Sequence, residues 1–170
     1  MASIIENLIT ALRQENEEYQ TLLRLSMEKT GIIVKGDPDA LSAMVEREQE
    51  VVNRINALEK KRLEATKDIG IVLNKKPQDL KLGAIIALMQ GQPKECEALK
   101  KVHDDLKQTM ARMVQVNEQN KALLQESLDM VQFEMNLLQS LKQGPVTANY
   151  DRKEYADSGY AMRGSFDAKQ

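Results

Sequence analysis

The chain has 170 residues, a formal net charge of -2 and one cysteine, and its aromatic residues are four Tyr and two Phe. Few aromatic residues, with much Leu, Met, Glu, Lys and Gln, predict an all-α protein of long helices. The balanced charge argues against a protein that binds nucleic acid. No signal sequence and no apolar run of bilayer length are present, so we expect a cytoplasmic protein without a membrane span.

The first predicted helix covers residues 3–35. Ser3 and Glu6 form the S-x-x-E pattern of a helix start, and apolar residues follow at helical spacing. A break at Gly36-Asp37-Pro38 then predicts a sharp end and the start of a second helix over 38–72, since glycine favours a helix end and proline fits a first turn.

A short, strongly apolar segment follows and predicts a third helix over 78–90. A buried strand is the alternative for such a run, but Pro77 at its start and the lack of a partner strand favour the helix. The fourth predicted helix covers 94–142 and has a length of roughly 75 Å, against roughly 50 Å for each of the first two. We therefore expect a coiled-coil-like bundle over residues 1–142 in which three long antiparallel helices run up, down and up.

Asparagines interrupt the apolar stripes of two of these helices. Asn117 and Asn120 lie three residues apart in the last helix, and Asn16 lies in the first. Buried polar residues fix the register of coiled coils, so we expect Asn117 and Asn120 to set the register of the long helices, with Asn16 as a candidate partner. The alternative is that they point to solvent at the edge of the seam.

The last helix changes character after Asn120. Stepping 100° per residue, residues 123–141 carry apolar side chains over roughly 220° of the helix, about twice the arc that one packed side requires. One stripe consists of Leu124, Leu128, Val131, Met135 and Leu138, and a second of Leu123, Met130, Phe133, Leu137 and Leu141. This predicts a partner or a second copy of the chain on this segment. The alternative is that other helices or the tail cover both faces within one monomer.

Residues 143–170 are expected to form a flexible tail because they are polar and balanced in charge. This tail nevertheless holds four of the six aromatic residues of the chain, which are Tyr150, Tyr155, Tyr160 and Phe166. Two interpretations stay open: the tail packs back on the bundle, or its aromatic side chains contact a partner.

Nothing in the sequence predicts catalysis, a cofactor or a metal. His103 is the sole histidine and Cys96 the sole cysteine, so neither a zinc site nor the paired Glu-x-x-His ligands of di-iron bundles can form within one chain. The glycines never take a phosphate-binding spacing. We expect a binding protein without enzymatic activity.

The order of these features resembles the FlgN family of flagellar type III export chaperones. The resemblance rests on the Gly36-Asp37-Pro38-Asp39 turn, Leu58-Glu-Lys-Lys-Arg62, Leu80-Lys-Leu-Gly-Ala-Ile, Tyr155-Ala-Asp-Ser-Gly159 in the tail and, above all, Asn117-x-x-Asn120-x-x-Leu123-Leu124-x-x-Ser127-Leu128.

The resemblance implies a cytoplasmic helical chaperone that binds unassembled hook-filament junction proteins (hook-associated proteins) and delivers them to the flagellar export apparatus. The client-binding residues on the last helix would be Leu123, Leu128, Met130, Phe133, Leu137 and Leu141. The alternative function is a structural coiled-coil adaptor that acts as a homodimer through the same segment.

Overall fold

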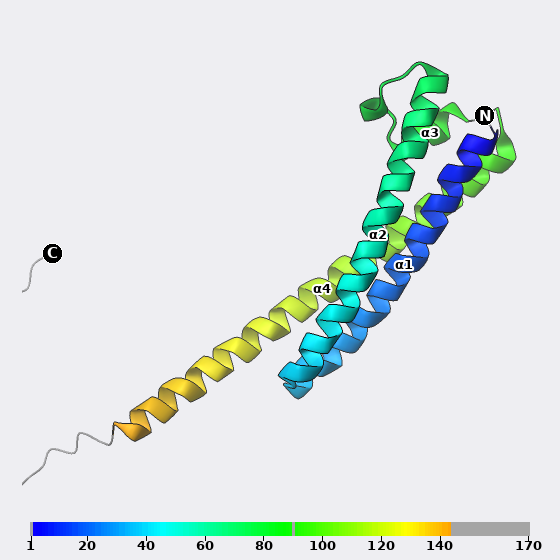
Figure 1. Ribbon diagram of the computed structural model, residues 1–170. Helices are drawn as coiled ribbons and strands as arrows, with labels where there is room; N and C mark the ends of the chain where they lie inside the picture. Colours follow the sequence, from blue (N-terminus) through cyan, green and yellow to red (C-terminus); the bar gives the residue numbers. More distant parts are fainter. Residues whose placement is uncertain (1, 90, 144–170) are drawn as a thin grey trace, which may run out of the picture. The chain divides into compact units, whose positions relative to one another are not determined.

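The protein is built from helices, as a computed structural model shows (Figure 1). The structure describes the backbone of residues 2–89 and 91–143, and side chains from Ile4 onward except that of residue 90. No strand occurs within these ranges, and the predicted all-α fold is confirmed. The helices are α1 (Ala2–Lys35), α2 (Pro38–Leu73), α3 (Leu82–Leu88) and α4 (Pro93–Lys142), with a single 3-10 turn at Pro77–Asp79.

The connection between α1 and α2 follows the local chemistry of its residues. Gly36 takes a positive φ of 68°, which glycine adopts without a steric penalty, and its N–H donates to the carbonyls of Ile32 and Ile33. The side chain of Asp37 accepts hydrogen bonds from the N–H groups of Asp39 and Ala40, at 3.1 and 3.0 Å. This cap satisfies two of the free donors at the start of α2.

The end of α2 depends on a close approach between two backbone segments. Asn74 takes the left-handed conformation with φ 50°, and the N–H of Lys75 donates to the carbonyl of Gly70 at 2.9 Å. A Cβ atom at position 70 would lie 2.9 Å from the carbonyl oxygen of Lys75, so a residue with a side chain does not fit there without a shift of the backbone.

The single helix expected over 78–90 is in fact two elements. Extended backbone at Lys81 separates the 3-10 turn from α3, which ends at Leu88 and is seven residues long. The break turns Leu80 into the core, where 4% of its surface is exposed, and Ile85 of α3 is 1% exposed. Two short elements can each point one apolar side chain into the core. Side chains on one continuous helix would instead keep a fixed angular spacing around its axis.

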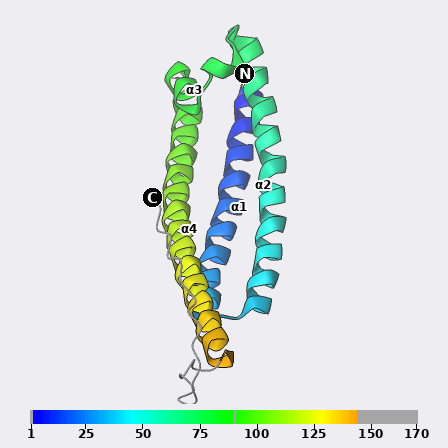
Figure 2. The same ribbon diagram turned by 90° about the vertical axis from the view of Figure 1, so that its left-hand side faces the viewer.

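The compact part of the chain ends at Val131, and residues 132–143 are described separately. Within the compact part, α1 and α2 form an antiparallel pair, and α4 runs beside α1 in the same direction (Figures 1 and 2). This is the up-down-up order expected from the sequence. At 50 residues, α4 is longer than α1 with 34 residues and α2 with 36.

The apolar core consists of two clusters along the three long helices. The first cluster lies at the end that holds α3 and buries Ile85 of α3 together with residues of all three long helices, among them Leu8, Leu12, Ile69 and Leu99. The second cluster lies nearer the α1–α2 turn and includes Leu22, Leu25, Met44, Val51, Ile55 and Met113. Both clusters stabilise the fold by removing apolar surface from water.

Candidate protein-binding site

The second half of α4 exposes most of its apolar side chains. The buried residues of α4 are Leu99, Val102, Thr109, Met113 and Asn120, and none follows Asn120 in the described part of this helix. Leu123 and Leu124 are half-buried. The exposed fractions of the eight large apolar residues that follow lie between 50% and 68%: Leu128, Met130, Val131, Phe133, Met135, Leu137, Leu138 and Leu141.

These side chains include the six residues expected to bind a client. Five of the six, Leu128, Met130, Phe133, Leu137 and Leu141, lie on the solvent-exposed surface of α4. The sixth, Leu123, is half-buried within the compact part of the chain. Soluble proteins rarely expose so many neighbouring apolar side chains on one helix, and such a surface is typical of a protein-binding site.

A polar layer precedes this exposed segment and joins α1, α2 and α4. Asn120 is 2% exposed. Its Oδ1 accepts a hydrogen bond from Thr30 Oγ1 at 2.5 Å, and its Nδ2 donates to the carbonyl of Ser26 at 2.8 Å. Ser26 Oγ in turn donates to Glu48 Oε1 at 3.0 Å, and Lys29 Nζ donates to Glu48 Oε2 at 2.7 Å. A buried amide with both polar atoms bonded stabilises one arrangement of the three helices.

The three asparagines singled out in the sequence have different environments. Asn117 is exposed, so it does not share the buried environment of Asn120. Asn16 lines a different groove, together with Val102 and Asp105, and its Oδ1 is buried without a hydrogen-bond partner among the described residues. Asn16 was a candidate partner of these asparagines, whereas the hydrogen bonds of Asn120 go to the side chain of Thr30 and the backbone of Ser26.

A second polar layer, which was not predicted from the sequence, lies between the two core clusters. Glu15 is 3% exposed, and its Oε2 lies 3.1 Å from Nε of Arg62 on α2. Burial raises the pKa of the Glu15 carboxyl; Arg62 opposes this shift, and Glu59 adds to it. Burial also raises the pKa of Tyr19, and the negative charge of Glu15 adds to that rise. The sequence does contain a signal for this layer, because Glu15 occupies one position of an apolar stripe at helical spacing. The other positions of that stripe are Leu8, Leu12, Tyr19 and Leu22.

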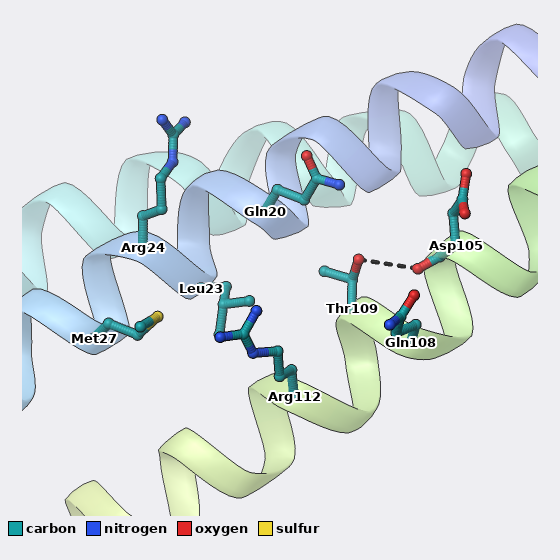
Figure 3. Close-up of a pocket in the computed structure, with 8 residues that line it drawn as sticks. All are labelled: Gln20, Leu23, Arg24, Met27, Asp105, Gln108, Thr109 and Arg112. Atoms are coloured by element: carbon teal, nitrogen blue, oxygen red, sulfur yellow. Dashed lines mark hydrogen bonds between the residues drawn. The ribbon is translucent and has the colours of Figure 1, made fainter.

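A polar groove of about 770 Å³ lies between α1 and α4. Figure 3 shows Gln20, Leu23 and Met27 of α1 facing Thr109 and Arg112 of α4 across this groove. Thr109 Oγ1 donates to the carbonyl of Asp105 on its own helix, at 3.0 Å. These groups do not form a nucleophile, a base and an oxyanion site of the kind that catalysis uses.

The sole histidine has a local partner. Nδ1 of His103 lies 3.2 Å from Oδ1 of Asp104, the next residue, on the surface of α4.

Across residues 2–89 and 91–143, no three His, Cys, Asp or Glu side chains come together as a metal site. None of the described helices is long and apolar enough to cross a membrane. The aromatic residues Tyr150, Tyr155, Tyr160 and Phe166 lie outside the described residues.

A long-helix bundle with an exposed apolar helix defines a class of protein, the helical protein-binding modules. Comparison with known proteins identifies the family within this class. The model of the FlgN protein family matches residues 1–156, and the chain belongs to the FlgN family. This is a family of chaperones rather than of enzymes, and it points to a role in flagellar export.

One curated relative is the uncharacterized protein YvyG of Bacillus subtilis (strain 168). The chain is 29% identical to it over 121 residues, which cover 71% of each of the two proteins. No solved structure matches the chain.

Proposed function

We propose that this protein is a cytoplasmic export chaperone for unassembled hook-filament junction proteins. It binds its client through the second half of α4, prevents the client from associating with itself, and delivers it to the flagellar type III export apparatus. The observation that carries the proposal is the set of eight large apolar side chains on the last helix of a FlgN-family protein, each 50–68% exposed.

Binding by this surface is favourable but limited in strength. Fully burying a large apolar side chain contributes about 1.5–3 kcal/mol, and roughly half to two thirds of each side chain is still open to water, so each contributes about 1–2 kcal/mol. Eight such residues give a gross gain of roughly 8–16 kcal/mol, against an association cost of about 4–15 kcal/mol. Most of the gross gain is therefore offset by the association cost, and this suits a chaperone that must release its client.

The test uses variants of residues that lie on the exposed surface of α4. Leu137→Asp combined with Leu141→Asp removes two large apolar contacts and places two carboxylates in the interface. We expect the affinity for a junction-protein C-terminal fragment, measured by isothermal titration calorimetry, to fall at least about 100-fold. Circular dichroism should show unchanged helicity, because these side chains are 50% and 68% exposed.

Gln132→Asp combined with Asn136→Asp is the matched control, since it adds the same two charges at exposed positions on the polar face of the same helix. This control should bind the fragment like the wild type. No complex of the wild type at high micromolar concentration would refute the proposal. If light scattering instead gave a concentration-independent dimer that the leucine variant dissociates, the homodimeric adaptor would be the better account.

A further inference from the structure

The exposed half of α4 carries two apolar stripes that are separated around the helix. At 100° per residue, the centre of the first stripe (Leu124, Leu128, Val131, Met135, Leu138) and that of the second (Leu123, Met130, Phe133, Leu137, Leu141) lie about 130° apart. Both stripes are open: Met135 in the first is 51% exposed, and Met130 in the second is 65% exposed.

One partner helix cannot cover both stripes. Helices pack with their axes 8–10 Å apart, so two helices centred on the two stripes would have axes about 16 Å from each other. A single helix with its side chains is only about 10–12 Å wide. A partner that buries the whole apolar surface must therefore contact α4 from two sides.

The remaining face of α4 is polar and already has hydrogen-bond partners on the helix itself. Gln125 Nε2 donates to Asp129 Oδ1 at 2.9 Å, and Gln132 Nε2 donates to Asn136 Oδ1 at 3.1 Å. Both are contacts between residues four apart on an exposed helix surface. This third face is therefore suited to solvent, and it limits the docking surface to the two stripes.

Charge distinguishes the two stripes. Two carboxylates of this segment, Glu126 and Glu134, lie within about 20° of the second stripe by helical periodicity, whereas Asp129 lies on the third face. By the same measure, Lys121 lies beside the first stripe and Lys142 lies within it. No carboxylate–lysine or carboxylate–arginine ion pair involves these five residues in the part of the chain that the structure describes. The charges are thus available to a partner.

We propose that the client contributes two amphipathic helices, which bind α4 on two sides. A helix with basic residues at the edges of its apolar face binds the second stripe, and a helix with acidic or uncharged edges binds the first. This inference rests on the proposed function, because it specifies the partner of the same surface.

The chain's own methionines allow a direct test, since oxidation to the sulfoxide reports how accessible each thioether is. The probe is a full-length junction protein, mixed with the full-length chaperone and treated with hydrogen peroxide before mass spectrometry. Oxidation of both Met130 and Met135 should slow at least about fivefold on complex formation. Met27 on α1 and Met110, which are 48% and 40% exposed and lie outside both stripes, are internal controls and should not change.

Each other outcome is decisive. Protection of Met130 with unchanged oxidation of Met135 would show a single bound helix, overturning the inference while leaving the chaperone function intact. Slow oxidation of Met135 in the free protein would mean that this chain covers its own first stripe, which also overturns it. A complex with two chaperone copies by light scattering overturns it too, whereas no complex at all refutes the proposed function instead.

A charge variant tests the assignment of the helices. Glu126→Lys combined with Glu134→Lys should raise the dissociation constant for the junction protein about tenfold, by repelling a basic-edged helix. Gln125→Lys combined with Gln132→Lys places two lysines on the third face and should leave the dissociation constant unchanged. Equal weakening by both pairs would contradict the charge assignment.

Discussion

The polar layer around Asn120 makes a quantitative prediction about stability. Asn120→Ala removes two hydrogen bonds, one from Thr30 Oγ1 and one to the carbonyl of Ser26. Each such bond contributes about 1 kcal/mol net. The groups left behind keep a partner, because Thr30 Oγ1 also lies 3.2 Å from the carbonyl of Ser26. We therefore expect a loss of about 2 kcal/mol and not the larger penalty of a buried unsatisfied group.

Thermal unfolding followed by circular dichroism measures this loss, and a change of about 2 kcal/mol corresponds to a decrease in Tm of roughly 4–8 °C for a domain of this size. Asn117→Ala is the matched control, since it makes the same chemical change three residues away at an exposed position, and its effect should stay within about 0.5 kcal/mol.

A double-mutant cycle with Thr30→Val should give a coupling energy of about 1 kcal/mol with Asn120→Ala. Equal destabilisation by the two asparagine variants would refute the assignment of the register contact to Asn120. So would a coupling energy near zero in the double-mutant cycle.

Two further predictions concern the rest of the bundle. The raised pKa of Glu15 means that the folded protein holds this proton more tightly than the unfolded chain, so the stability from this group is complete below the ordinary value of 4.5 and is lost as pH rises through the folded pKa. Urea unfolding across that range should show the loss in the wild type and not in Glu15→Gln, whereas Glu17→Gln at an exposed position should behave like the wild type. Gly70→Ala should destabilise by about 1–3 kcal/mol in urea unfolding, because the new Cβ meets the carbonyl of Lys75, whereas Gly31→Ala in α1, with open space around it, should stabilise by up to about 1 kcal/mol. A stabilising Gly70→Ala would contradict the close approach at the end of α2.

Local signals in the sequence were sufficient to predict where the long helices begin and end. The Gly36-Asp37-Pro38 turn combines a left-handed glycine, a capping carboxylate and a proline in the first turn, and each acts over a few residues. The long helices consequently begin and end within one residue of their predicted ends. The segment 78–90 was predicted less well, because its break at Leu80 and Lys81 depends on where the core requires an apolar side chain.

The partners of the buried polar groups could not be predicted from local pattern. Ser26 and Asn120 are 94 positions apart, and their contact depends on how far α4 is shifted along α1. Asn117 and Asn120 lie about 60° apart around the helix, so periodicity placed both on the seam. The part of the α4 surface that is actually buried is narrower than the apolar stripe in the sequence suggested. It includes Asn120 but not Asn117.

The two polar layers restrict how the length of this bundle can change. Glu15 and Arg62 form one ion pair between α1 and α2, and Lys29 and Glu48 form another. Seven residues inserted into α1 between these pairs would keep the helical phase but displace one pair by about 10.5 Å, leaving charges without partners. A matching insertion in α2 would restore both pairs, and the bond from Asn120 would require a third insertion in α4. Between the two polar layers, an insertion or deletion in one long helix therefore requires matching changes in the other two.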